Sequence, residues 1–183
     1  TLQTDSFDDR TRTALINQTR RILDSLYSKN QELYQEFLKT TLSEVYIQEI
    51  KRDVNYDSGW VEKEIFNTIR TDDYDSVLTL VEFIAQRMID CALQLFSTGV
   101  FSNAIQMYNS VFEKEYVGYR FVGEKILPIT NELERAAIET ALNSDFQKVQ
   151  QHLKKAVAFL ANRISPDYAN SIKESISAVE RMC

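Results

Sequence analysis

Apolar residues recur every three or four positions along most of the chain, and this spacing predicts amphipathic helices. The clearest stretch covers about residues 73–96 and is apolar around much of its circumference. A helix of this kind is typical of the centre of a bundle. We expect its stripe to be formed by Val77, Leu80, Val81, Ile84, Met88, Ile89, Cys91, Leu93 and Leu95.

The same periodicity predicts further helices at about residues 7–27, 31–51, 61–69, 103–116, 131–142 and 147–162. A break near Thr40–Thr41 in the second of these is left open. A last helix follows Ser165 and carries an apolar stripe of Tyr168, Ile172, Ile176 and Val179. Residues suited to cap the helix starts are Asp5 and Ser6, Asn131, Ser144 or Asp145, and Ser165 before Pro166.

One segment departs from the helical spacing. Aromatic and β-branched residues flank the pair Gly123-Glu124 on both sides, from Tyr116 to Ile129. A two-residue turn with glycine between such segments predicts a β-hairpin, here near residues 119–129. The sequence therefore predicts a mainly α fold, a multi-helix bundle with one small β-hairpin that lies on the helices.

Composition supports this fold class. The chain has only four glycines and two prolines among 183 residues. Sandwiches, barrels and nucleotide-binding folds need these residues for their turns and phosphate loops, so we exclude those classes. At 44% hydrophobic residues, the chain is also too apolar to be disordered.

The charge is unevenly distributed along the chain. Residues 1–90 hold 11 basic and 17 acidic side chains, whereas residues 91–183 hold 10 of each, which gives the net charge of −6. This net charge argues against a protein that coats DNA non-specifically. With the position of the hairpin, it predicts a helical module at residues 1–117 and a second at 118–183, the hairpin plus three helices. One continuous domain is the alternative.

Little in the sequence points to catalysis. Cys91, Cys183 and the single histidine, His152, have no metal-ligand spacing, and no glycine-rich phosphate loop or nucleophile elbow is present. We therefore expect no cofactor and no enzymatic activity of this chain alone. Two cysteines and no 18-residue apolar run indicate a cytoplasmic protein without a membrane span.

Two stretches are candidates for a binding surface. Basic residues near His152 could face RNA or an acidic partner, although a solvated lysine-rich face is the ordinary interpretation. The aromatic stretch of the hairpin could stack a flat ligand, although packing on the bundle is the alternative. The candidate residues are Tyr119, Arg120, Phe121, Lys148, His152, Lys154 and Lys155, with Arg163 close to the basic group.

Several short motifs carry a family resemblance. They are Gly-Tyr-Arg-Phe-Val at 118–122, Pro-Ile-Thr-Asn-Glu at 128–132, Gln-Gln-His-Leu-Lys-Lys-Ala at 150–156, Ser-Pro-Asp-Tyr at 165–168 and the run at 170–180. Together with the opening motif at residues 5–12, they resemble the N-terminal domain family of AbiJ-type bacterial abortive-infection proteins. The resemblance is dense over 118–183 and thin over 28–117.

The resemblance implies a role in phage defence. In that family the N-terminal domain precedes a helical HEPN-type domain, a metal-independent RNase whose signature is Arg, four to six residues, then His. His152 would need an arginine at 145–147, where Asp145, Phe146 and Gln147 stand, so the signature is absent. We expect a sensor or regulatory domain that controls a C-terminal HEPN-type RNase, with the last helix leading into that missing domain.

Two alternatives remain open: a protein-interaction module without a defence role, and a fragment of an RNase whose site is completed beyond Cys183. The resemblance further implies a homodimer and a phage-derived trigger or RNA as partners.

Overall fold

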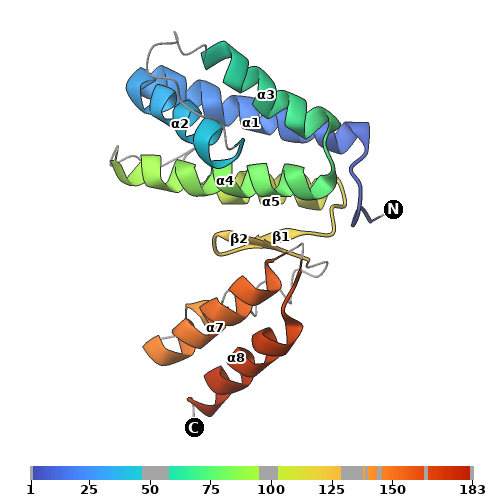
Figure 1. Ribbon diagram of the computed structural model, residues 1–183, viewed down its shortest axis with the longest axis vertical. Coiled ribbons are helices and arrows are strands. Elements are labelled where there is room, and N and C mark those ends of the chain that lie inside the picture. Colours follow the sequence, from blue (N-terminus) through green and yellow to red (C-terminus); the bar gives the residue numbers. More distant parts are fainter. Residues whose placement is uncertain are drawn as a thin grey trace. The chain divides into compact units, whose positions relative to one another are not determined.

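The computed structural model describes residues 2–46, 58–94, 103–128, 138, 140–143, 146–162 and 165–181. They form two compact units, residues 3–116 and residues 117–183 (Figure 1). Within the described residues the chain is mainly helical with a single two-stranded antiparallel sheet, which confirms the predicted fold class. The division of the chain into separate modules at residues 1–117 and 118–183 stays a prediction.

Unit 1, residues 3–116, is a bundle of helices. Its elements are α1 (Asp9–Lys29), α2 (Gln31–Glu44), α3 (Ser58–Thr71), α4 (Tyr74–Gln94) and α5 (Ala104–Lys114). Helix α1 packs against α2, α3 and α5, while α4 packs against α3 and α5. The core of unit 1 draws on all five helices: Leu15, Ile22 and Leu26 of α1 and Val77, Val81 and Ile84 of α4 are fully buried at the helical spacing, and Phe37 of α2, Ile65 of α3 and Tyr108 of α5 are fully buried as well.

The stripe of α4 is narrower than predicted. Val77, Val81 and Ile84 are fully buried, but Leu93 is 71% exposed. At about 100° per residue, position 93 lies on the opposite side of the helix from the buried positions. Leu93 was therefore wrongly assigned to the core. Leu95 lies outside the described residues.

The first helix begins at a different residue from the one predicted. The N-cap of α1 is Asp8 rather than Asp5 or Ser6, because the Asp8 carboxylate accepts the backbone N–H of Thr11 at 2.7 Å. This hydrogen bond lowers the pKa of Asp8. Gln3 occupies the space before the helix, where its side chain accepts the Asp8 N–H and donates to the Glu115 carbonyl.

Helix α2 continues through Thr40 and Thr41 without a break. The two hydroxyls donate to the carbonyls of Glu36 and Phe37, so the helix itself satisfies them. Asn30 separates α1 from α2: its backbone N–H donates to the Leu26 carbonyl, and its side chain caps α2 at the Leu33 N–H. Residues 47–57, including the predicted end of this helix, lie outside the described residues.

Unit 2 contains the predicted hairpin. Strands β1 (Arg120–Val122) and β2 (Lys125–Leu127) pair antiparallel, with Val122 opposite Lys125. Gly123 has φ 59°, a conformation that costs L-residues with a side chain about 1–2 kcal/mol. The hairpin therefore depends on glycine at the first position of its turn.

Helices α7 (Gln147–Leu160) and α8 (Tyr168–Glu180) pack against each other, and α7 also packs on β2 (Figure 1). The core of unit 2 gathers around Val122 and Leu127; Ile138, Leu142, Val157, Leu160 and Ala161 pack against them. Most of the helix predicted at 131–142 lies outside the described residues, while residues 138 and 140–142 are helical.

The starts of α7 and α8 also differ from the prediction. Phe146 stands at the N-cap of α7 without a side-chain hydrogen bond, and Ser144 and Asp145 lie outside the described residues. Asp167, not Ser165, caps α8, since its carboxylate accepts the Asn170 N–H at 3.0 Å. An acidic cap also suits the positive end of the helix dipole.

Candidate functional site

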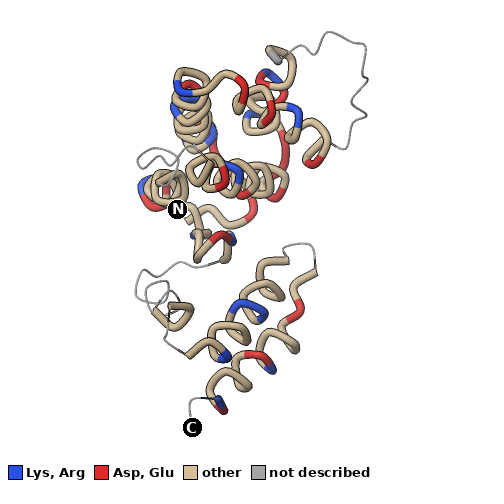
Figure 2. Tube along the Cα trace, turned by 90° about the vertical axis from the view of Figure 1, so that its left-hand side faces the viewer, with Lys and Arg blue, Asp and Glu red and all other residues tan. Residues whose placement is uncertain are grey.

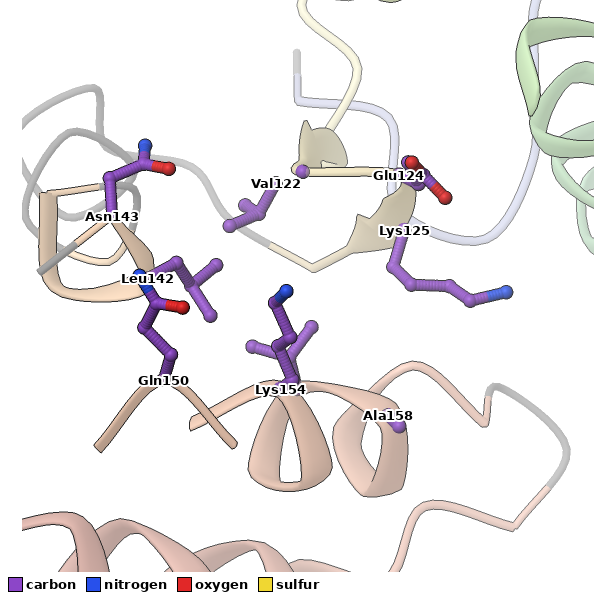
Figure 3. Close-up of a pocket in the computed structure, with 10 residues that line it drawn as sticks. Val122, Glu124, Lys125, Leu142, Asn143, Gln150, Lys154 and Ala158 are labelled. Atoms are coloured by element: carbon purple, nitrogen blue, oxygen red, sulfur yellow. The ribbon is translucent and has the colours of Figure 1, made fainter. Parts of the chain in front are cut away.

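The hairpin, residues 142–143 and one side of α7 enclose a cavity of about 610 Å³ within unit 2 (Figure 3). Its lining residues are Val122, Gly123, Glu124, Lys125, Leu142, Asn143, Gln150, Lys154, Val157 and Ala158. Three of the apolar ones, Val122, Leu142 and Val157, also belong to the core of unit 2. The floor is therefore held by core packing, which suits a pre-formed binding site.

One basic side chain is directed into this cavity. Figure 3 shows Lys154 extending from α7 towards the hairpin, with Val122 and Leu142 beside its path. Among the described residues, the Lys154 ammonium has no salt bridge and no hydrogen bond. Glu124 and Lys125 of the hairpin turn also line the cavity, so its rim carries charges of both signs above an apolar floor, which suits a small organic ligand with a charged group.

The structure separates the predicted basic residues. Lys154 lines the cavity, whereas Lys148 and Lys155 are exposed on other sides of α7. Arg163 lies outside the described residues. Figure 2 shows acidic as well as basic positions on the α7–α8 pair, so the lysines do not form an uninterrupted basic strip.

His152 faces α8 instead of the cavity. Its Nδ1 lies 2.7 Å from Oε2 of Glu174, and the two side chains are 24% and 20% exposed. This hydrogen bond is the main reason why the pKa of Glu174 is lowered, with Lys155 and Lys173 adding to the effect. Ser171 makes a second link between the helices, because its hydroxyl donates to the Ala156 carbonyl at 2.9 Å.

The predicted aromatic surface is mostly covered. Tyr119 is 9% exposed and Phe121 is fully buried, so their rings offer little area for stacking a ligand. Nη1 of Arg120 donates to the carbonyls of Val117 and Tyr119 at 2.6 and 2.7 Å. None of the three residues lines the cavity.

The structure adds residues that sequence reasoning missed. Gln150 belongs to the cavity, as do Glu124 and Lys125 from the hairpin turn. Gln150, Lys154 and Val157 share one face of a helix at spacings of four and three, a signal that was available in the sequence. The sequence does not indicate, however, that this face of α7 lies against the hairpin.

In the described part of the chain, no group of three His, Cys, Asp or Glu residues is placed so that it could hold a metal ion. Cys91 is buried, which raises the pKa of its thiol and makes the thiolate scarce. None of the described helices is long and apolar enough to cross a membrane.

The apolar stripe of α8 forms the second notable surface of unit 2. Tyr168, Ile172, Ile176 and Val179 are each between 55% and 62% exposed. The helix instead turns Ala178, Ser171 and Glu174 towards α7. Contiguous exposed apolar side chains of this size mark interaction surfaces in soluble proteins.

Comparison with known families shows which family the chain resembles. A family described as AbiJ N-terminal domain 4 matches residues 1–144. The match includes residues 28–117, where we found the resemblance thin, and it ends before the motifs at 150–156, 165–168 and 170–180. No curated protein and no solved structure matches the chain significantly.

Proposed function

The chain belongs to the AbiJ N-terminal domain 4 family and is therefore an abortive-infection-associated protein; from this premise we propose that it is a regulatory domain. Its role is to restrain a HEPN-type RNase carried by the same polypeptide on the C-terminal side. We expect it to act in the cytoplasm, where such an RNase meets RNA. The observation that carries the proposal is the exposed stripe of α8.

Helix α8 is suited to contact another protein surface. Its four exposed side chains are large and lie on one face, whereas the face towards α7 is made of small and polar residues. Both α7 and α8 lie beyond residue 144, where the family match ends. This pair of helices thus extends from the matched domain and supports a role as its contact with the RNase.

The cavity supplies a route for a trigger to act on this contact. Lys154 and Val157 of α7 line it, and the same helix contacts α8 through His152, which pairs with Glu174, and through the Ala156 carbonyl, which accepts from Ser171. A ligand that moves α7 would shift α8, because well-packed helices transmit displacement rather than absorb it. The proposed regulation therefore runs from the cavity through α7 to the stripe.

The test uses the native full-length protein expressed in bacteria without phage. Replacing Ile172 and Ile176 by Asn should release the RNase, so that RNA cleavage rises and growth stops. Lys173→Gln, an exposed neighbour on the same helix, should leave growth unchanged. Circular dichroism checks that the variant remains folded, and Tyr168→Ser provides a second, milder change of the same surface.

Two results would contradict the proposal. One is a folded double variant that cleaves RNA and permits growth like the unaltered protein. The other is a loss of self-association with unchanged RNase activity, which would assign the stripe to contact between two copies.

A further inference from the structure

A second concave surface lies in unit 1, and none of the binding-surface residues predicted from the sequence lines it. It has a volume of about 370 Å³ and is formed by α1 and α3. Its lining residues are Arg20, Gly59, Glu62, Lys63, Phe66 and Arg70. Three of the six are cations, within the half of the chain that holds the acidic excess.

These cations have no carboxylate partner in the described part of the chain. Arg20, Lys63 and Arg70 are exposed, and no ion pair joins any of them to another described residue. Three like charges in one small concavity repel one another, and the single carboxylate there, that of Glu62, offsets only one of them. Such an arrangement favours a negatively charged ligand.

The one carboxylate of this surface is already engaged. Oε2 of Glu62 accepts a hydrogen bond from the Tyr34 hydroxyl. Whatever its partner, it carries one negative charge against the three positive charges of the lining, which leaves an excess of two. The remaining positive charge exceeds what a single carboxylate ligand would balance.

Aromatic packing orients one of the cations. The guanidinium carbon of Arg20 lies 4.7 Å from the centre of the Phe66 ring, which is itself 7% exposed. Stacking on a buried ring limits the freedom of the guanidinium and leaves its outer N–H groups available. Lys63 and Arg70 lie seven residues apart on α3 and share its face with Phe66.

We propose that Arg20, Lys63 and Arg70 form a binding site for a phosphate group, of the kind carried by a nucleotide. A dianionic phosphomonoester matches the excess of positive charge, and the arginine fork matches its oxygens. The shallow shape admits the phosphate while the rest of the ligand extends into solvent. This site is independent of the proposed control of an RNase.

Binding is measured on the intact chain by isothermal titration with AMP, and with adenosine as the uncharged counterpart. AMP should bind and adenosine should not. Replacing Arg20, Lys63 or Arg70 by Gln should weaken AMP binding about threefold each and about 30-fold together, as expected for separate exposed charges. Arg21→Gln removes the same charge from the adjacent position of α1 and should have no effect, because Arg21 does not line the site.

Inorganic phosphate and a single-stranded RNA octamer identify the source of the phosphate. Binding of AMP and inorganic phosphate alike indicates a free phosphate group, and much tighter binding of the octamer indicates an RNA backbone. Because Arg20 covers Phe66, the Arg20→Gln variant could lose stability as well as charge. Thermal unfolding is therefore compared for all variants. If Arg20→Gln is unstable, the Lys63 and Arg70 variants still test the proposal.

Equal weakening by Arg21→Gln would overturn the proposal, as would AMP binding that survives the triple substitution. Preference for an aspartate-rich peptide over every phosphate probe would also overturn it, by assigning the surface to an acidic protein segment.

Discussion

At the scale of single residues, a buried pair of hydroxyls joins two helices of unit 1. The hydroxyls of Thr19 and Tyr108 lie 2.8 Å apart, and both residues are fully buried. Burial also raises the pKa of Tyr108 well above its ordinary range. The pair ties α1 to α5 at positions 89 residues apart in the sequence.

We expect Tyr108→Phe to lower the free energy of unfolding by about 1–2 kcal/mol, because the buried Thr19 hydroxyl loses this partner. Urea denaturation measures the change. Tyr27→Phe is the control, since Tyr27 is 49% exposed and its substitution should cost less than about 0.5 kcal/mol. Equal effects of the two substitutions would argue against a stabilising role of the pair.

The link between His152 and Glu174 predicts a dependence of stability on pH. The pKa of Glu174 is lowered in the folded chain from its ordinary value of 4.5. The carboxylate therefore contributes stability above that value and loses it as the pH falls through the lower, folded pKa. Melting temperatures of the wild-type protein and of Glu174→Gln should differ at pH 6 and converge towards pH 3.

Glu180→Gln serves as the control, because Glu180 is exposed near the end of the same helix and should show no such convergence. A difference between wild type and Glu174→Gln that stays constant over this pH range would mean that the carboxylate charge is not involved.

At the scale of elements, the turn of the hairpin depends on the backbone conformation of Gly123. An added Cβ at Gly123 would meet no atom within 4 Å, so only the backbone conformation at φ 59° opposes a side chain. Gly123→Ala should therefore cost about 1–2 kcal/mol. Gly123→Asn should cost less, since Asn tolerates this region better.

Chemical denaturation of the two Gly123 variants, with Glu124→Ala as the control for the turn, measures these costs. If the Ala variant is as stable as the wild type, the turn does not require the left-handed conformation.

The elements also show which features could be predicted from the sequence. The spacing of Leu15, Ile22 and Leu26 in α1 predicts a helix, and the segment around Gly123-Glu124 predicts a hairpin. Both depend on neighbours within a few residues. The first residue of a helix is harder to predict from the sequence, because Asp5, Ser6 and Asp8 are all suitable N-caps. In the folded chain Asp8 is the N-cap, and Gln3 contacts both its N–H and the Glu115 carbonyl.

At the scale of the whole molecule, the two compact units provide the last prediction. Tyr108→Phe should speed hydrogen exchange in α1 and α5 of unit 1 and leave the protection of α7 and α8 in unit 2 unchanged. Local destabilisation spreads only through the cooperative unit that contains it. Exchange measured by mass spectrometry on the intact chain distinguishes this from a uniform loss of protection, which would indicate a single cooperative domain.

The sequence by itself determined the class of the molecule. Helical periodicity, the scarcity of glycine and proline, and one glycine turn specify helices with a hairpin, because these signals act over a few neighbouring residues. Short motifs also identified the AbiJ family, whose match extends over residues 1–144.

Only the tertiary structure decided which surfaces remain open. The stripe of α8 looks in sequence like any buried stripe, yet α7 contacts the opposite, smaller side chains and leaves Ile172 and Ile176 exposed. Arg20 meets Lys63 and Arg70 only because α1 packs on α3. Burial and charge clustering depend on contacts between distant parts of the chain, which the local pattern does not contain.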